Sequence, residues 1–342
     1  MATDIIKTDA LIVGAGPCGL FQVFELGLLG IRAHIVDSMR VVGGQCAELY
    51  PDKPIYDIPG IPECSGQELI DNLMLQIKPF DAVFHLGEEV ATVVANDGGF
   101  DVSTDAGTRF QTKTLFIAGG VGSFQPRRVR LDGIEMHEDK SLYYRVREPQ
   151  KFAGKTVVIF GGGDSALDWT LALQPLVKSL TLVHRRAEYR AAPATVEAMK
   201  KLVAAGGMRE LIGKISEYRA DHERLTGISV TTESGVEEID CDALLVFWGL
   251  APKLGPIAEW GLDINRKTIN VDTEKFETST PGIYAVGDIN YYPGKKKLIL
   301  SGFHEAALAA FAAKERIEPG TKARLQYTTT SPLMHERLGI KD

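Results

Sequence analysis

The sequence has 342 residues, of which 44% are hydrophobic and 24% are charged, and its formal net charge is −7. This length exceeds the usual size of one compact core, so we expect two domains. The acidic balance disfavours non-specific nucleic-acid binding, and no run of about 20 apolar residues predicts a membrane helix. A strand-like segment begins almost at once, without a basic leader, so we expect a cytoplasmic protein that binds neither nucleic acid nor membrane.

The first motif along the chain is a glycine-rich turn between an apolar strand and an apolar helix. Gly14, Gly16 and Gly19 form the pattern GxGxxG, whose glycines permit a tight turn, a close approach to a pyrophosphate and close helix packing. A second strand ends on Asp37, whose carboxylate is placed to accept hydrogen bonds from ribose hydroxyls. The expected elements are a strand over residues 10–13, a helix over residues 20–29 and a strand over residues 33–36.

The same unit recurs in the middle of the chain. Gly161, Gly163 and Ala166 form GxGxxA between an apolar strand and a helix. His184 follows Gly161 by 23 positions, which is also the spacing between the first glycine and the acidic residue of the first unit. The expected elements are a strand over residues 156–160, a helix over residues 166–173 and a strand over residues 180–183.

The residues at the equivalent position predict two different ligands. A carboxylate bonds a free 2′-hydroxyl and repels a 2′-phosphate, so Asp37 predicts FAD or NAD in the first site. Arg185 and Arg186 follow His184 directly, and guanidinium groups bind phosphate with charge-assisted hydrogen bonds. We therefore expect NADP in the second site. The expected NADP contacts are Gly161, Gly163, Asp164, Ser165, His184, Arg185, Arg186 and Arg190.

Several runs give the chain a resemblance to a known family. Residues 43–45, 116–120 and 280–288, together with the two glycine motifs, resemble the two-dinucleotide-domain flavoproteins that include low-molecular-weight thioredoxin reductase. The resemblance covers nearly the whole chain and implies FAD and NADP(H) as cofactors and a homodimer. It implies an α/β protein with two Rossmann-like three-layer domains. The NADPH domain, residues 122–250, is then inserted into an FAD domain made of residues 1–121 and 251–342, of which 324–342 are a C-terminal extension.

The resemblance also implies individual FAD contacts. Asp288 is expected on the flavin ribityl chain, and the helix over residues 301–313 is expected to present backbone amides to the pyrimidine ring. Tyr50 is expected to stack on one flavin face, and Tyr327 or His335 of the extension to cover the other. The expected FAD contacts are Gly14, Gly16, Pro17, Cys18, Gly19, Asp37, Gly44, Gln45, Tyr50, Val90, Phe124, Asp288 and Thr329.

The cysteines bear on the reaction by what they lack. Cys18, Cys46, Cys64 and Cys241 show neither CxxC nor zinc-like spacing, so we expect free thiols and no metal. In thioredoxin reductases a redox-active CxxC corresponds to about residues 141–147, which hold no cysteine here, and the glutathione-reductase partner of Cys46 would be Pro51. Without a disulfide relay the chain resembles the ferredoxin–NADP reductases of thioredoxin-reductase type. Hydride transfer to flavin needs no protein acid or base, so no catalytic residue is assigned.

The resemblance implies an acidic partner, ferredoxin or flavodoxin, and therefore a basic docking surface. The candidate clusters are Arg127, Arg128 and Arg130, then Arg145 and Arg147, then Lys295, Lys296 and Lys297. Two alternatives remain open. One is a disulfide reductase that uses an unrecognised pair such as Cys46 and Cys64, and the other is a non-catalytic flavin-binding redox sensor.

Overall fold

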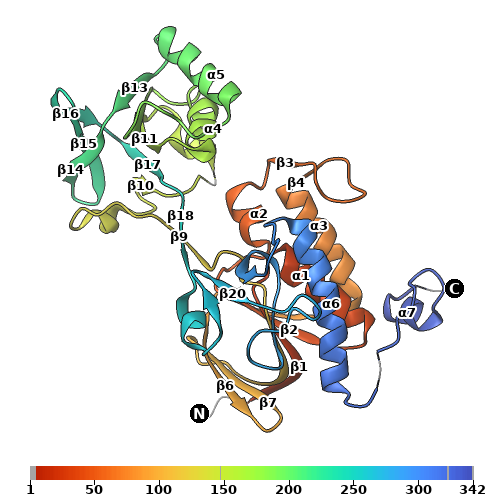
Figure 1. The fold of residues 1–342 in the computed structure, drawn as a ribbon. Coiled ribbons are helices and arrows are strands. Elements are labelled where there is room, and N and C mark those ends of the chain that lie inside the picture. The colour runs from red at the N-terminus through yellow and green to blue at the C-terminus, as the bar shows by residue number, and fades with distance from the viewer. Residues whose placement is uncertain (1–4, 147, 322, 341–342) are drawn as a thin grey trace. The chain divides into compact units, whose positions relative to one another are not determined.

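The computed structural model describes residues 5–146, 148–321 and 323–340, without the side chains of residues 123–125 and 250–252. The chain divides into two compact units, Met1–Ser123 with Pro252–Asp342, and Phe124–Ala251 (Figure 1). The second unit is therefore inserted into the first. The chain crosses at the strands β9 (Ser123–Pro126) and β18 (Leu250–Lys253), which pair with each other.

The first unit is built on a seven-stranded sheet with the order β5-β2-β1-β8-β7-β6, in which β21 also pairs with β8. Strands β5, β2, β1, β8 and β21 are parallel, and β7 and β6 add an antiparallel edge. The apolar run of β1 is buried on both faces, as expected for a central parallel strand. The strands are β1 (Ile6–Val13), β2 (Ala33–Asp37), β5 (Val83–Leu86), β6 (Val90–Asn96), β7 (Gly99–Thr104), β8 (Arg109–Ile117) and β21 (Ile283–Ala285).

Helices α1 (Pro17–Leu28), α3 (Gly66–Ile77) and α6 (Ile299–Ile317) lie together on one face of this sheet (Figure 1). Alanines on the buried side of α6 allow it to approach α1 closely. The opposite face packs against the β6–β7 edge and residues 254–271, which completes three layers. The smaller elements are α2 (Gly44–Leu49), α7 (Pro332–Arg337), β3 (Pro54–Ile55), β4 (Cys64–Ser65), β19 (Ile264–Asn265), β20 (Thr268–Asn270), β22 (Asn290–Tyr291) and the 3-10 turns η1 (Lys78–Phe80), η4 (Gly255–Glu259) and η5 (Gly287–Ile289).

The second unit also has three layers. A five-stranded parallel sheet with the order β10-β17-β11-β12-β13 forms the centre, two helices cover one face, and a three-stranded antiparallel sheet covers the other. The elements are β10 (Leu142–Tyr143), β11 (Thr156–Gly161), β12 (Ser179–His184), β13 (Arg209–Ile212), β17 (Ala243–Phe247), α4 (Asp164–Leu173), α5 (Pro193–Ala204), β14 (Lys214–Asp221), β15 (Arg224–Thr232), β16 (Gly235–Asp240), η2 (Ile134–His137) and η3 (Pro149–Phe152). The predicted fold class, two Rossmann-like three-layer units with one inserted into the other, is confirmed.

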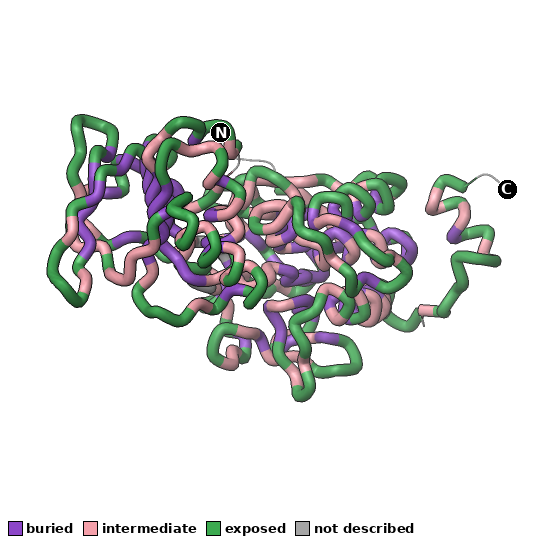
Figure 2. The backbone as a smooth tube through the Cα atoms, turned by 90° about the horizontal axis from the view of Figure 1, so that it is seen from above, coloured by how far each residue is buried: buried purple, intermediate pink, exposed green. Residues whose placement is uncertain are grey.

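Burial follows the sheets of the two units, while most of the C-terminal segment is exposed (Figure 2). The strands and helices expected around both glycine motifs are present, with small differences at their ends. Helix α1 begins at Pro17, three positions earlier than predicted, because proline is well suited to the first turn of a helix. No helix in the described ranges is both long and apolar enough to cross a bilayer.

Candidate cofactor sites

The first glycine turn connects β1 to α1 with almost no spare volume. Gly14 has a φ of +111°, and a Cβ there would lie 2.5 Å from the carbonyl oxygen of Ala118. A Cβ at Gly19 would overlap the carbonyl oxygen of Gly14, so the helix can pack on the turn only with glycine at this position. Gly16 instead leaves room, because its nearest neighbour would be the Cα of Gly44 at 3.9 Å. The turn is thus closed toward the protein and open toward a ligand.

The N-terminus of α1 is free to receive an anion. Its N-cap, Gly16, offers no capping side chain, and the first turn holds no acidic residue. Pro17 stands at the first helical position, where no intrahelical hydrogen bond is lost. Unpaired N–H groups and the helix dipole at such an end favour a pyrophosphate. The residues present therefore fit a dinucleotide.

Asp37 stands at the carboxyl end of β2, beside this turn. Its carboxylate accepts hydrogen bonds from the N–H groups of Ala15 at 2.6 Å and of Met39 at 2.8 Å. Burial raises the pKa of Asp37, and these two hydrogen bonds oppose that shift. The carboxylate therefore fixes the glycine loop and the segment after β2, and the structure holds it where the adenosine ribose of a dinucleotide is expected.

Helix α2 is held against the same turn. The N–H of Gly43 donates to the carbonyl oxygen of Ala15 at 2.8 Å, and a φ of +53° at Gly44 lets the two glycine segments approach. The Nε2 atom of Gln45 lies 3.5 Å from the position that a Gly120 Cβ would take. The motif of residues 43–45 and the run of residues 116–120 thus meet at the carboxyl ends of the parallel strands.

Tyr50 ends α2 as a half-buried ring. Its hydroxyl lies 3.5 Å from the Sγ atom of Cys46. Burial is the main cause that raises the pKa of Tyr50, so the phenol is neutral at physiological pH. A neutral, partly exposed ring beside the glycine segments is suited to stacking on a flat ligand.

Asp288, although distant in the sequence, lies at the same carboxyl ends of the strands. The N–H of Val286 donates to the carbonyl oxygen of Ile117 at 3.0 Å, so the chain leaves β21 next to β8. Gly287 then turns with a φ of +78°. The half-buried carboxylate of Asp288 makes no hydrogen bond to any residue in the described part of the chain, which leaves it available to a ligand hydroxyl.

Cys18 joins the first turn to this segment. Its Sγ atom lies 2.9 Å from the position that a Gly287 Cβ would take, and a Cβ at Gly302 would overlap it. Burial, and then the carboxylate of Asp288, raise the pKa of Cys18 to about 12, so the thiol stays protonated and is no nucleophile. Cys18 is therefore a packing residue between the glycine turn and helix α6.

The remaining expected FAD contacts are less concentrated. Val90, whose expected contact to FAD is through its backbone, lies at the start of β6, and its side chain is 2% exposed and belongs to the core. Phe124 belongs to β9, and its side chain lies outside those that the structure describes. Thr329 and Tyr327 are exposed in the C-terminal extension, and the ring nitrogen Nε2 of His335 lies 2.7 Å from the carbonyl oxygen of Thr328.

Helix α7 of the extension packs on the same chain. Met334 is 4% exposed, and the guanidinium of Arg337 donates to the carbonyl oxygen of Leu28. This contact is at the C-terminal end of α1, whereas the glycine turn is at the N-terminal end of that helix. Within one chain, α7 is therefore anchored at the far end of α1 from the turn.

The second glycine turn connects β11 to α4. A Cβ at Gly161 would lie 2.7 Å from the carbonyl oxygen of Phe247, whereas Gly163, the N-cap of α4, has open space around it. Ser165 is exposed in the first turn of α4. The carboxylate of Asp164 accepts a hydrogen bond from the N–H of Ala192 at 2.9 Å. This turn is also open on the side where a ligand would approach.

His184 ends β12 beside the second turn. Its ring stacks on Tyr189 with the ring centres 5.0 Å apart, and its Nε2 atom lies 3.2 Å from the carbonyl oxygen of Glu188. A Cβ at Gly162 would overlap the His184 ring, which shows how closely the ring meets the turn. Burial, and then the neighbouring arginines, lower the pKa of His184, although the hydrogen bond to Glu188 opposes this shift.

Three cations follow His184 in one loop. The N–H of Arg190 donates to the carbonyl oxygen of Gly162 at 2.7 Å, which holds the loop on the glycine turn. Arg185, Arg186 and Arg190 are all exposed, and none has an ion pair with another described residue. Unpaired guanidinium groups at this position fit the additional phosphate of NADP.

The cysteines provide no electron relay in the described residues. All four are free thiols, and Cys46, Cys64 and Cys241 are buried. Burial raises the pKa of each of these three. The described residues also contain no cluster of histidine, cysteine and carboxylate side chains that would hold a metal ion.

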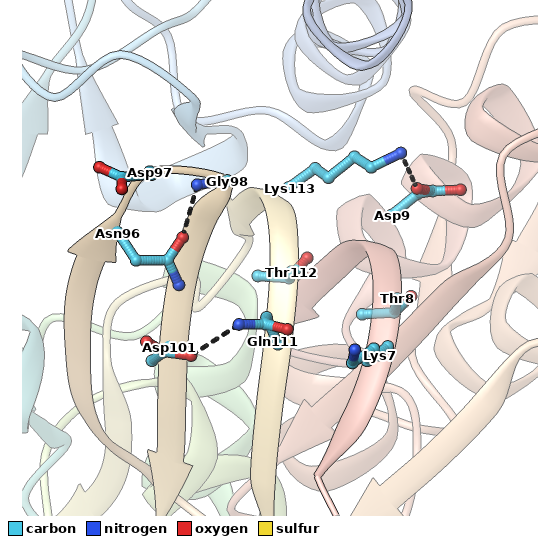
Figure 3. Close-up of a pocket in the computed structure, with 10 residues that line it drawn as sticks. All are labelled: Lys7, Thr8, Asp9, Asn96, Asp97, Gly98, Asp101, Gln111, Thr112 and Lys113. Carbon is cyan, nitrogen blue, oxygen red and sulfur yellow. Dashed lines mark hydrogen bonds and ion pairs between the residues drawn. The ribbon is translucent and has the colours of Figure 1, made fainter.

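A polar hollow of about 570 Å³ lies at the other end of the first sheet (Figure 3). It is beside the start of β1, whereas the glycine turn follows the end of that strand. Three pairs of its polar groups bond each other, among them the ion pair between Lys113 and Asp9 at 2.8 Å. The Nδ2 atom of Asn96 is buried without a hydrogen-bond partner in the described residues. The lining residues are Lys7, Thr8, Asp9, Asn96, Asp97, Gly98, Asp101, Gln111, Thr112 and Lys113.

One expectation about the docking clusters is wrong. The sequence places Lys295 in a surface cluster, but only 3% of its side chain is exposed, and its ammonium group pairs with the fully buried carboxylate of Glu305. Glu305 is not among the residues that the sequence predicts at a site. A signal was present, because a charged residue among the alanines of an apolar helix face requires a buried partner. Of the arginine clusters, Arg128 pairs with Glu138, and Arg147 lies outside the described residues.

Comparison with known proteins agrees with this geometry. Residues 8–323 match the family described as pyridine nucleotide-disulphide oxidoreductase. The chain is 62% identical over 338 residues to ferredoxin–NADP reductase 2 of Cupriavidus taiwanensis, covering 98% of this chain and 92% of the relative. It is 60% identical to the ferredoxin–NADP reductase of Methylibium petroleiphilum, covering 98% and 93%.

Solved structures show the same fold. The thioredoxin reductase of T. acidophilum is 25% identical, with a TM-score of 0.72 over 90% of this chain and 98% of that one. The thioredoxin reductase of Lactococcus lactis, at 21% identity, also gives a TM-score of 0.72, over 91% and 99%. The chain therefore belongs to the pyridine nucleotide-disulphide oxidoreductase family and, within it, to the ferredoxin–NADP reductases of thioredoxin-reductase-like fold.

Proposed function

We propose that the protein is an FAD-dependent enzyme that transfers electrons between NADP(H) and ferredoxin or flavodoxin. One observation carries the proposal: two units of the same build end their second strands on residues of opposite chemistry. Asp37 ends the first, and His184 ends the second, followed by Arg185 and Arg186. A carboxylate suits the free ribose of FAD, and unpaired guanidinium groups suit the 2′-phosphate of NADP.

The first unit, residues 1–121 and 251–342, holds FAD in this proposal. The N-terminus of α1 receives the pyrophosphate, Asp37 the adenosine ribose and Asp288 the ribityl chain. Cys18 keeps the glycine turn and α6 at a fixed separation. The full set of proposed contacts is Gly14, Gly16, Pro17, Cys18, Gly19, Asp37, Gly44, Gln45, Tyr50, Val90, Phe124, Asp288 and Thr329.

The second unit, residues 122–250, holds NADP(H). The open Gly163 admits the pyrophosphate to the N-terminus of α4, and His184 with Arg185, Arg186 and Arg190 receives the 2′-phosphate. The lowered pKa of His184 makes its ring neutral at physiological pH, so the arginines supply the positive charge. Gly161, Asp164 and Ser165 complete the proposed set.

The chemistry itself comes from bound FAD, which exchanges hydride with nicotinamide and single electrons with a protein carrier. The residues of the chain bind and orient, and none is assigned as an acid, a base or a nucleophile. Tyr50 covers one side of the ring system. The anchoring of α7 at the far end of α1 supports a homodimer in which Tyr327 or His335 covers the flavin of the partner.

The carrier docks through cations in this proposal, and Lys296 and Lys297 are exposed in the segment that follows Asp288. An acidic ferredoxin or flavodoxin would be attracted to them. We expect these steps to take place in the cytoplasm.

Steady-state turnover with NADPH tests the proposal. The purified protein should be yellow, and it should reduce ferredoxin or flavodoxin much faster than thioredoxin. The matched variant replaces Cys46 and Cys64 with alanine and leaves the glycine turns unchanged, so ferredoxin reduction should persist in it. Reduction of a disulfide substrate that is lost in this variant would establish a disulfide reductase instead. A protein that binds FAD but is not reduced by NADPH would be a flavin-binding sensor.

A further inference from the structure

A buried ion pair stands directly behind the segment that carries Asp288. Glu305 is fully buried, and 3% of the Lys295 side chain is exposed. The Oε1 atom of Glu305 accepts hydrogen bonds from the ammonium of Lys295 and from the hydroxyl of Tyr292, the latter at 2.9 Å. Its Oε2 atom accepts hydrogen bonds from the N–H of Gly287 at 2.7 Å and from the side-chain amide of Asn290 at 2.8 Å.

These four donors share one short stretch of chain. All lie within residues 287–295, which include Asp288, and the acceptor lies on α6. The carboxylate therefore fastens the whole stretch to the helix whose N-terminus is near it. Two opposite charges have been removed from water here, and such a pair is tolerated only when hydrogen bonds satisfy both groups. The carboxylate of Glu305 thus fixes the turn with a buried charge, and this charge requires Lys295 as its partner.

The same charges act on the glycine turn of the first unit. The pKa of Cys18 is raised by burial first, then by Asp288 and Glu305, while Lys295 opposes the shift. Cys18 packs closely against Gly287 and Gly302. The charged groups that act on Cys18 therefore act where the glycine turn and α6 come together. With both partners charged, the pair adds no net charge at this point.

We propose that Lys295 and Glu305 are a positioning pair that holds the Asp288 turn on α6 and, because their charges cancel, prevents either charge alone from shifting the reduction potential of bound FAD. The inference rests on the proposed function, because it takes Asp288 and the N-terminus of α6 as flavin contacts. Reduced flavin carries negative charge at its pyrimidine end. A lone cation nearby therefore favours the reduced form, and a lone anion disfavours it.

Redox titration of the purified holoprotein against a reference dye tests the pair. Glu305→Gln keeps the shape and the acceptor for Gly287 but leaves the ammonium alone, so it should raise the flavin potential. Lys295→Met leaves the carboxylate with neutral donors, so it should lower the potential. Each variant should change the ratio of reduced to oxidised flavin at a fixed potential by about tenfold, the order expected for one unbalanced charge near the flavin in the protein interior.

The double variant, Glu305→Gln with Lys295→Met, has no net charge and should return close to the wild-type potential. Lys275→Met removes an exposed charge from the same unit at a residue with no proposed role in cofactor or carrier binding, and should leave the potential unchanged. Shifts in the same direction for both single variants, or no shift in either, would overturn the proposal. If neither single variant retains FAD, the double variant decides, since loss of FAD there too would overturn a role for charge balance.

The wild-type protein distinguishes loss of the proposed function from loss of the role of the ion pair. A wild-type protein that binds no FAD would remove the proposed function itself. A wild-type protein that binds FAD and is reduced by NADPH, but whose potential ignores both variants, would leave the proposed function standing and remove only the role of the pair. Glu305→Asp, which keeps the charge on a shorter side chain, should bind FAD more weakly at an unchanged potential.

Discussion

The two glycine-rich units of the chain are built to the same plan. In the first, Val13 of β1 pairs with Val36 of β2, and the next residues are Gly14 and Asp37. In the second, Phe160 of β11 pairs with Val183 of β12, and the next residues are Gly161 and His184. The matched spacing in the sequence is therefore matched in space. The difference between the sites cannot come from the backbone plan and must come from side chains.

What differs is where each characteristic side chain makes its contacts. The carboxylate of Asp37 points back to its own turn and accepts two backbone N–H groups. The ring of His184 is stacked on Tyr189, and the cations beyond it are exposed. The first site is thus preorganised by internal hydrogen bonds, whereas the second presents unpaired charge. A shared scaffold can choose between dinucleotides with the few residues that follow one strand.

The third position of the two motifs offers the largest effect. Gly19→Ala would force a Cβ against the carbonyl oxygen of Gly14, a backbone atom that cannot move without opening the turn. We expect this variant to lose FAD, and much of the first unit's stability, while nucleotide binding by the second unit is affected far less. FAD content by absorbance and NADP⁺ binding by calorimetry report on the two units separately.

Two variants serve as controls for this prediction. Ala166→Gly makes the second motif like the first and should cost about 1 kcal/mol through helix propensity, without loss of FAD. Gly16→Ala places a methyl group whose nearest protein neighbour, the Cα of Gly44, lies 3.9 Å away, so the unit should fold normally and bind FAD more weakly. A Gly19→Ala protein with full FAD content would show that this close contact does not restrict the site.

The cations of the second site offer an intermediate effect. Replacing Arg185 and Arg186 with alanine removes two exposed guanidinium groups that have no partner in the described structure. We expect the KM for NADPH to rise by about tenfold to a hundredfold, the usual value of charged hydrogen bonds, with kcat less affected. The KM for NADH should change little, because NADH lacks the 2′-phosphate. Steady-state kinetics with both nucleotides measure this directly.

Arg224→Ala is the matched control, since it removes an exposed arginine from β15 of the same unit. It should leave both KM values unchanged. Equal losses with NADPH and NADH in the double variant would mean that the two arginines support the loop rather than select the phosphate.

The elements around both sites could be predicted from sequence because their signals are local. Buried parallel strands are runs of apolar residues, and a glycine whose Cβ would strike backbone, as at Gly14, has no substitute. The equivalence of Asp37 and His184 also follows from counting residues from the first glycine of each motif. These features depend on neighbours within a few positions, so they need no knowledge of the rest of the fold.

The prediction for Lys295 was wrong because its surroundings depend on distant parts of the chain. In the sequence Lys295 resembles its exposed neighbours Lys296 and Lys297, and only the packing of α6 in the fold places Glu305 beside it. The packing of α7 on the end of α1 is likewise a contact between the two ends of the sequence. Such pairings are set by tertiary contacts rather than by periodicity, and a single sequence does not reveal them.

Histidines next to the first site give the smallest predicted difference between the units. His34 on β2 has its Nδ1 atom 3.0 Å from the Nε2 atom of His85 on β5, whereas the equivalent position of the second unit is Thr181. Burial, and then His85, lower the pKa of His34; burial also lowers the pKa of His85, although Glu88 opposes that shift.

The sign of the pH effect follows from these two shifts. Below the usual histidine pKa of 6.5 the unfolded chain binds protons that the folded first unit does not, so folding stability falls as the pH falls. His34→Gln keeps a hydrogen-bonding side chain but does not titrate. It should reduce this acid sensitivity, raising the temperature of FAD release by about 2 °C at mildly acidic pH and leaving it unchanged at alkaline pH.

His222→Gln is the control, because it replaces an exposed histidine of the second unit, and it should have no such effect. Equal acid sensitivity in wild type and His34→Gln would mean that other groups of the first unit take up the protons, and the contrast with Thr181 would then have no consequence for stability.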